Sequence, residues 1–261
     1  MKLNMTRPMP NWMEKRVVDD YSDFSRKAFW KAYHWQAAVA LFRSGVIQNG
    51  GAVLDLGSGP GWISFIMKQF CPQAVITGVD ISDEMVKASA EFAAEQGLQD
   101  ISFVQGDAME LPFADNSFDM ITSFAVLRLV PEPAKAIQEA YRVLKPGGLM
   151  YISDVGQMPV EHRQAFLDGI ENPVANDIMQ KALASALSPE EIHAALASIS
   201  DSEKEVATGG SAGFESGSRE ILDWVREGFP LRELRGVGEG PAWASEISKH
   251  WTHIYVRKAL S

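Results

Sequence analysis

The stretch VLDLGSGPG at residues 53–61 holds the residues whose types and spacing point most directly to chemistry. A short apolar run leads into Gly57, Gly59 and Gly61, and a pattern typical of a helix follows at once. Glycines at such a turn permit a tight bend and close approach of the backbone to a ligand, and Gly61 lets the helix pack near the strand. A purely structural strand–turn–helix junction has the same pattern, so the surrounding residues must decide between the two.

Three aspartates lie near the carboxyl ends of the first three expected strands. Asp55 stands two positions before the first glycine, Gly57. Asp80 ends the second strand, where an acid in a doubly wound fold hydrogen-bonds the ribose of a nucleotide-type cofactor. Its alternative role is a charge at a helix N-terminus, beside the expected cap Ser82. Asp107 ends the third strand and can accept a hydrogen bond from an adenine amino group, unless it is only a loop residue.

The spacing of the glycines favours one class of cofactor over another. A dinucleotide fingerprint reads G-x-G-x-x-G, whereas this loop reads G-x-G-x-G and follows an acid. A pyrophosphate needs backbone N–H groups and no carboxylate, but a cofactor with an amino-acid tail can use a carboxylate for its ammonium group. The loop therefore favours an adenosyl amino acid.

The elements that must position these residues alternate between strand and helix. Strands are expected at 52–56, 74–80, 101–107, 117–126 and 147–155, and helices at 62–70, 83–96 and 134–144. Gly97 is the expected end of the second of these helices. Such βαβ units predict an α/β fold with a doubly wound, parallel sheet in the order 3-2-1-4-5.

The flanking regions are predicted less fully. Residues 11–46 show helical spacing of apolar residues. After the fifth strand we expect helices at about 159–171 and 174–186, and a third that begins at Ser188 with a capping box. Residues 203–209 and 250–259 are typical of strands, and 218–228 of a helix, whereas 229–248 have no assignment.

Four motifs in the correct order resemble class I S-adenosylmethionine-dependent methyltransferases. These are VLDLGSGPG, the acid in GVDIS, GDAMELPFADNSFD and EAYRVLKPGGLMYISD, which together cover about residues 50–155. The segment SFAVLRLVPEPAKAIQEAYRVLKPGG is most similar to the ubiquinone/menaquinone-biosynthesis type and related small-molecule methyltransferases. The resemblance implies a Rossmann-like, seven-stranded, mostly parallel sheet whose last strand is antiparallel.

The resemblance also implies a division of the chain and a set of cofactor-binding residues. An N-terminal helical lid would occupy 1–49, and the methyltransferase domain 50–261 with a helical insertion at about 156–200. Asp55 and the loop Gly57, Ser58, Gly59 and Gly61 would hold the methionine end of S-adenosylmethionine. Asp80 would bind the ribose, and Ser123 would border the sulfonium. The adenine ring would contact Ile81, Asp107 and Ala108.

Candidates for the acceptor side of the site carry weaker signals. Tyr21, Tyr33 and His34 lie in the N-terminal helical region, where ordinary helix packing explains them equally well. Arg128 follows the fourth strand and could orient an anionic or carbonyl acceptor or pair with an acid. The sequence Ser-Phe-Ala-Val at 123–126 differs from the Asn-Pro-Pro-Tyr type that acts on exocyclic amines of bases or on glutamine.

Composition narrows the function further. The chain has 261 residues, 46% of them hydrophobic, a net charge of −10 and one cysteine, Cys71. The single cysteine excludes an intramolecular disulfide and a cysteine-built metal site and suits the cytoplasm. The acidic balance argues against a nucleic-acid partner, and the chain has neither a signal-peptide pattern nor an apolar run long enough for a membrane span.

The function expected is methyl transfer from S-adenosylmethionine to a small-molecule acceptor, with S-adenosylhomocysteine as product and no metal. A homodimer is compatible with the sequence. Two alternatives remain open: another adenosyl-sulfonium reaction on the same fold, and a non-catalytic protein that binds S-adenosylmethionine.

Overall fold

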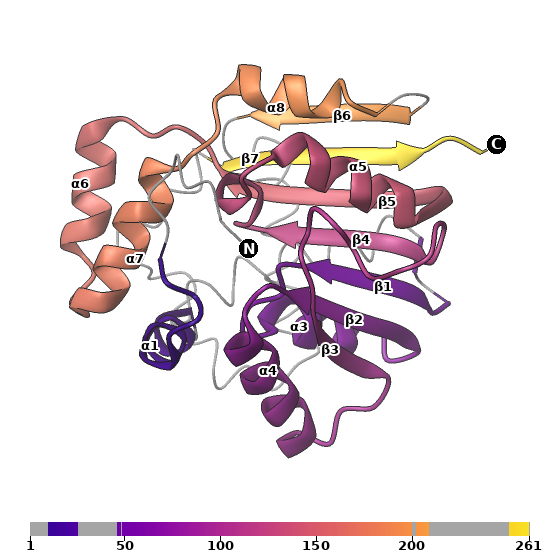
Figure 1. Cartoon of the computed structure of the whole chain (residues 1–261), viewed down its shortest axis with the longest axis horizontal. Coiled ribbons are helices and arrows are strands. Elements are labelled where there is room, and N and C mark those ends of the chain that lie inside the picture. Colours follow the sequence, from indigo (N-terminus) through magenta and orange to yellow (C-terminus); the bar gives the residue numbers. More distant parts are fainter. Residues whose placement is uncertain (1–9, 26–45, 48, 200–201, 209–250, 261) are drawn as a thin grey trace, which may run out of the picture.

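One sheet of seven strands, with helices on both faces, forms the centre of the computed structural model of this chain (Figure 1). The structure describes residues 10–25, 46–47, 49–199, 202–208 and 251–260. The strands are β1 (Gly51–Leu56), β2 (Ala74–Asp80), β3 (Ile101–Gln105), β4 (Phe118–Phe124), β5 (Leu144–Val155), β6 (Ser202–Thr208) and β7 (Trp251–Lys258).

The strand order confirms the predicted doubly wound topology. It runs β3-β2-β1-β4-β5-β7-β6. The strands β1 to β5 pair in parallel, whereas β7 is antiparallel to both β5 and β6, as the family resemblance implies for the last strand. Parallel strands joined by helices place their carboxyl ends at one edge of the sheet, with the reversal of strand order between β1 and β4.

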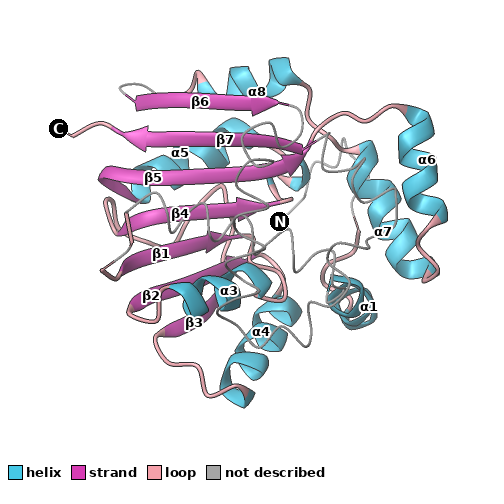
Figure 2. Ribbon diagram, turned by 180° about the vertical axis from the view of Figure 1, so that it is seen from behind, coloured by secondary structure: helices cyan, strands magenta, loops and turns pink. Residues whose placement is uncertain are grey.

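The helices within the described ranges cover both faces and the carboxyl edge. They are α1 (Lys15–Ser25), α3 (Trp62–Phe70), α4 (Asp83–Glu95), the short 3-10 helix η1 (Leu127–Leu129), α5 (Pro133–Val143), α6 (Val160–Asp168), α7 (Pro173–Ala184) and α8 (Pro189–Leu196). In Figure 1 α5 lies in front of the sheet, and in Figure 2, seen from behind, α3 does. Helices α1, α6 and α7 lie beyond the carboxyl ends of β1 and β4.

Alternation of side chains along the strands divides the core into two layers. On one face Leu54 and Ile121 pack with Ile137 of α5 and Ile192 of α8. On the other, Val53, Ile76 and Met120 pack with Ile63 and Met67 of α3. Burial of large side chains on both faces stabilises the sheet, at about 1.5–3 kcal/mol for each fully buried Leu, Ile or Met. Both layers end at the carboxyl edge of the sheet, which is where doubly wound folds bind ligands.

Helix caps fix the start of the helix that follows β2. Ser82 is the N-cap of α4, and its side chain accepts a hydrogen bond from the Met85 N–H at 3.2 Å. At the far end Gln96 is the C-cap, and Gly97 beyond it has φ +65°. Ser188 caps α8 with the expected capping box, completed by Glu191.

The structure moves several expected boundaries. The third strand ends at Gln105, short of Asp107, and β4 ends at Phe124 because Ala125 turns into a left-handed conformation with φ +60°. Strand β5 begins at Leu144. Helix α1 spans part of the helical region expected at 11–46; Tyr33, His34 and the expected helix at 218–228 lie outside the described residues.

Candidate functional site

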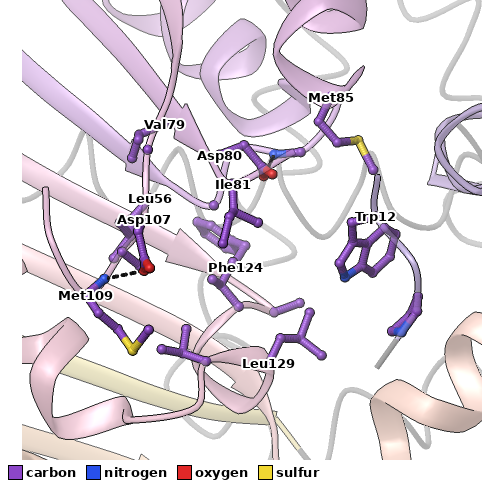
Figure 3. Close-up of a pocket in the computed structure, with 18 of the residues that line it drawn as sticks. Trp12, Leu56, Val79, Asp80, Ile81, Met85, Asp107, Met109, Phe124 and Leu129 are labelled. Atoms are coloured by element: carbon purple, nitrogen blue, oxygen red, sulfur yellow. Dashed lines mark hydrogen bonds between the residues drawn. The ribbon is translucent and has the colours of Figure 1, made fainter. Parts of the chain in front are cut away.

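A cavity of about 310 Å³ opens at the carboxyl edge of the sheet, where β1, β2 and β4 end (Figure 3). Its wall consists of short segments from five places in the chain. They are residues 10–13 with Tyr21, Leu56, Gly57 and Gly59 at the glycine loop, Val79 to Ile81 with Met85, Gly106 to Met109, and Phe124 to Val126 with Leu129 to Pro131.

Asp80 lies in this wall, and its carboxylate also organises the glycine loop. Oδ2 accepts the Gly59 N–H at 2.8 Å, and Oδ1 accepts the Ser82 N–H at 2.9 Å. Burial raises the pKa of this carboxyl, and the backbone N–H groups of Ser82, Gly59 and Ile81 oppose the shift. Each carboxylate oxygen can accept a second hydrogen bond, so Asp80 can hold the loop and bind a ligand hydroxyl together.

Asp107 lies beside Asp80 because the ends of β2 and β3 are tied together. The Gly106 N–H donates to the Asp80 carbonyl at 2.9 Å. The Asp107 Oδ1 accepts the Met109 N–H at 2.9 Å, shown as the dashed line in Figure 3. Among the described residues, none donates a hydrogen bond to the Asp107 Oδ2, so this oxygen can accept a hydrogen bond from a ligand amine.

The glycine loop is held open by its backbone geometry. Gly57 has φ +69° and donates its N–H to the Val79 carbonyl at 2.8 Å. A Cβ at Gly57 would lie 2.4 Å from Cγ2 of Val126, so only glycine fits between this loop and the segment after β4. The loop and that segment together form one continuous side of the cavity.

An N-terminal strap, defined as residues 10–14, closes the opposite side. The Trp12 indole lies across the cavity from Ile81 and Phe124 in Figure 3. It packs edge-on against Tyr21 of α1, with ring centroids 5.1 Å apart and an interplanar angle of 74°. Burial raises the pKa of the Tyr21 phenol, against the influence of Arg128. The phenol therefore stays protonated at neutral pH and can donate a hydrogen bond.

Asp55 is not among the residues that line the cavity, and its expected contact with the ammonium group of the cofactor stays a prediction. Its neighbour Leu56 faces the cavity, and alternation along β1 directs Asp55 toward α3. There it accepts hydrogen bonds from the hydroxyls of Ser64 at 2.6 Å and Thr122 at 3.2 Å. Burial raises the pKa of the Asp55 carboxyl to about 7.

Three more expected cofactor residues lie behind the wall rather than in it. Ser58 is buried over Gly78, where a Cβ would approach its Oγ to 2.8 Å. Gly61 leaves room for Phe65 and Phe103, as expected for a glycine that lets helix and strand pack closely. Ser123 is buried within β4, and the next residue, Phe124, reaches the wall instead.

Of the two acceptor-side candidates that the structure describes, one lines the cavity and the other does not. Tyr21 lines the cavity. Arg128 does not: it is buried, forms an ion pair with Asp154, and donates its Nε–H to the Ala182 carbonyl at 3.1 Å. Of the two roles open to Arg128, the structure supports pairing with an acid.

The sequence indicates parts of the cavity wall without indicating which side chains face the cavity. The segment 125–131 lies within the stretch that resembles the quinone-biosynthesis type, but its apolar residues are irregularly spaced. At its start, the Ala125 N–H donates to the Ser153 carbonyl of β5 at 2.8 Å, a contact between distant parts of the chain. The strap lies within the helical lid expected at 1–49, but no motif marks Trp12 as part of the wall.

Replacing Asp55 by asparagine is expected to change how stability depends on pH. The raised pKa means that the folded chain binds the Asp55 proton more tightly than the unfolded chain. Its contribution is therefore present below the unfolded pKa and is lost as the pH rises through about 7. Between pH 5 and 8 we expect the unfolding free energy of the wild-type protein to fall by about 2 kcal/mol more than that of Asp55→Asn. Urea denaturation at both pH values measures the difference, and parallel pH profiles of the two proteins would contradict it.

Two absences concern only the part of the chain that the structure describes. There, no helix is both long and apolar enough to span a membrane. Over the same residues, no three or more His, Cys, Asp or Glu side chains gather in a way that could hold a metal ion.

Comparison with known sequences places this geometry in context. Residues 47–208 match the family described as "Methyltransferase domain". The demethylmenaquinone methyltransferase of Listeria monocytogenes serotype 4a (strain HCC23) is 40% identical over 112 residues, which are 42% of this chain and 47% of that protein. That of Staphylococcus aureus (strain JH9) is 39% identical over 112 residues, 42% and 46% of the two chains. The matches thus span just under half of these curated relatives.

Solved structures share the fold. The plantazolicin methyltransferase BpumL in complex with SAH has a TM-score of 0.65 at 18% identity, covering 95% of this chain and 92% of that one. The [4+2]-cyclase SpnF has a TM-score of 0.54 at 25% identity, covering 81% and 76%. The same architecture therefore carries proteins whose names denote two different reactions.

Proposed function

This chain belongs to the methyltransferase-domain family, and we propose that it transfers the methyl group of S-adenosylmethionine to a small-molecule acceptor. The observation that carries the proposal is the cavity beside the glycine loop, which brings Asp80 and Asp107 into one wall. The sequence matches cover about half of the curated relatives' length. We therefore infer the activity of this chain from the cavity rather than from the activity of those relatives.

The residues of the cavity fit the adenosyl part of this cofactor. Asp80 can accept hydrogen bonds from two ribose hydroxyls, and Ile81 offers an apolar surface for the adenine ring. The Asp107 Oδ2 and the Ala108 backbone can bind the adenine edge. Gly57 and Gly59 border the cavity with backbone alone, which leaves room for the methionine end.

The chain acts by positioning rather than by strong acid–base chemistry. Bound in the cavity, S-adenosylmethionine supplies an activated methyl group that an acceptor atom attacks in line. The strap and the segment 125–131 would exclude water, and the glycine loop would fix the direction of approach. The protonated phenol of Tyr21 would donate a hydrogen bond to the acceptor or cofactor, because its raised pKa disfavours a role as general base.

The acceptor would lie against an apolar wall. Trp12, Met13, Leu129, Val130 and Pro131 line the cavity around its polar cofactor side. This lining supports a small, largely apolar acceptor. It also supports a covering role for the N-terminal lid proposed at 1–49. Of that lid the structure describes residues 10–25, 46–47 and 49. The names of the curated relatives make 1,4-naphthohydroquinone the first compound to test.

Two measurements test the proposal in order. In calorimetry we expect S-adenosylmethionine and S-adenosylhomocysteine to bind with micromolar affinity and NAD to bind far more weakly. Incubation with S-adenosylmethionine and a panel of acceptors, beginning with reduced 1,4-naphthoquinone, should then release S-adenosylhomocysteine and give a product heavier by one CH₂ in mass spectrometry. Tighter binding of NAD than of S-adenosylhomocysteine would overturn the cofactor assignment.

A second candidate function has one observation in its favour, the similarity to a protein named as a [4+2]-cyclase. In that case the cofactor would bind without giving up its methyl group. Tight binding of S-adenosylmethionine together with its full recovery after incubation with every acceptor would favour this reading, or a non-catalytic binding protein, over methyl transfer.

We further propose that the protein works in the cytoplasm, since its single cysteine suits a reducing compartment. The acidic net charge supports a small-molecule partner rather than a nucleic acid. A homodimer remains compatible with the sequence, and light scattering of the purified chain would decide it.

A further inference from the structure

Ser82 makes three contacts that join separate parts of the site. Its N–H donates to the Asp80 Oδ1, and its Oγ accepts the Met85 N–H as the cap of α4. Its hydroxyl proton goes to the carbonyl of Trp12, a residue 70 positions earlier in the chain. Ser82 is fully buried, and its partners Asp80 and Trp12 are partly buried. A single serine thus connects the acid proposed to bind ribose with the N-terminal strap.

The strap has few hydrogen bonds of its own, so the contact with Ser82 contributes to holding it in place. Its backbone bonds within the strap are short-range, from Trp12 N–H to the Pro10 carbonyl and from Glu14 N–H to the Asn11 carbonyl. Met13 is 53% exposed, whereas Pro10 is buried and Trp12 packs on Tyr21. The hydrogen bond from Ser82 is one link between the strap and the sheet edge.

Helix α1, which follows the strap, is anchored separately. Asn172 at the start of α7 donates to Asp20 at 3.1 Å, and the Trp62 indole N–H donates to Ser25 Oγ at 2.8 Å. These bonds fix the middle and the end of α1. The Trp12 ring packs on Tyr21 of this helix, and the Trp12 backbone carbonyl is tied to the start of α4 by the Ser82 hydroxyl.

We propose that Ser82 is a positioning residue that holds Trp12 and the strap over the cavity and so strengthens binding of the adenosyl group. The inference rests on the proposed function and adds a residue that the cofactor itself need not touch. Binding of ribose hydroxyls to Asp80 would order the carboxylate that also accepts the Ser82 N–H. Cofactor occupancy and strap closure would then favour each other.

The chain offers a matched control for the experiment. Ser82 and Ser188 are both N-cap serines whose Oγ accepts a backbone N–H at 3.2 Å, but Ser188 lies at the start of α8, far along the sheet from the strap. Glycine is a tolerable N-cap that has no hydroxyl. Each glycine variant loses the side-chain cap, but only Ser82→Gly also removes the donor to Trp12, so we expect Ser82→Gly to lose more thermal stability than Ser188→Gly.

Calorimetry with S-adenosylhomocysteine then separates the two roles of Ser82. We expect Ser82→Gly to bind about five- to tenfold more weakly than the wild-type protein, the scale of one net hydrogen bond. Ser188→Gly should bind like the wild type, and Ser82→Thr, which keeps a hydroxyl, should recover most of the affinity. Equal affinity of folded Ser82→Gly and wild-type protein would show that Ser82 only caps α4 and would overturn the inference.

Limited trypsin digestion provides a readout that does not need the cofactor. Lys15 and Arg16 are exposed directly after the strap. Cleavage there should be faster in Ser82→Gly than in Ser188→Gly, and S-adenosylhomocysteine should slow it only where the hydroxyl is present. Equal cleavage of the two glycine variants would contradict the link. If the wild-type protein binds no S-adenosylhomocysteine, the proposed function fails, while faster cleavage of Ser82→Gly alone would still support the hold on the strap.

Discussion

Replacing Asp80 by alanine is expected to weaken binding of S-adenosylhomocysteine by about 2–4 kcal/mol, or roughly 30- to 1000-fold. The change removes the proposed acceptor of ribose hydrogen bonds. It also leaves the N–H groups of Gly59 and Ser82 without the carboxylate that now accepts them, at 2.8 and 2.9 Å. The loss should therefore exceed that of a side chain that only touches the ligand. Calorimetry on the folded variant measures it.

Asp83 provides the matched control for this prediction. It is three positions away and also acidic, but its side chain is 52% exposed and pairs with Lys87 on the surface of α4. Asp83→Ala should leave the affinity unchanged. An affinity of Asp80→Ala within threefold of the wild type, in protein whose thermal unfolding is cooperative, would show that the ribose binds elsewhere.

The parts of this molecule that the sequence predicted are those with local chemical signatures. The glycines, the acids at the strand ends and the Ser82 and Ser188 caps each follow from backbone rules that act over a few residues. The alternation of strands and helices is similarly local, and right-handed crossovers then restrict the topology to a few choices. Asp80, Ile81, Asp107 and Ala108 all line the cavity, and their contacts with the cofactor stay a prediction.

Side-chain direction was harder to predict than position. Asp55 stands at the correct place along the chain, but alternation along β1 turns it toward Ser64 on α3, and Leu56 faces the cavity instead. At the end of β4, Ser123 is buried and Phe124 lines the cavity. A shift of one residue in a strand reverses which face a side chain meets. Motif spacing alone does not resolve that shift.

Contacts between distant segments were beyond prediction from one sequence. Arg128 could orient an acceptor or pair with an acid, and only the position of Asp154 on β5 decides between the two. The bond between Ser82 and Trp12 spans 70 positions. Such pairings depend on how the strap, the segment 125–131 and α7 pack together, which the pattern within each segment does not indicate.

Substituting alanine for Gly57 is expected to destabilise the fold by about 2–5 kcal/mol and to abolish measurable binding of S-adenosylhomocysteine. Gly57 has φ +69°, a conformation that costs a residue with a Cβ about 1–2 kcal/mol. The new Cβ would also lie 2.4 Å from Val126 Cγ2, and overpacking of this kind costs about 1–3 kcal/mol. Relief of the clash would displace the loop or the segment 125–131, both of which form the cavity wall.

A double-mutant cycle separates the clash from the backbone strain. Gly97 has φ +65°, and a Cβ at this position would meet no atom of the described residues within 4 Å, so Gly97→Ala measures the cost of the left-handed conformation alone. Val126→Ala removes the two methyl groups that a Cβ at Gly57 would meet at 2.4 and 2.6 Å and leaves the Val126 Cβ at 3.0 Å. In the double variant we expect the unfolding free energy to recover most of the difference between Gly57→Ala and Gly97→Ala, and part of the ligand affinity to return. Additive losses from the two single changes would mean that Val126 is not what reserves this position for glycine.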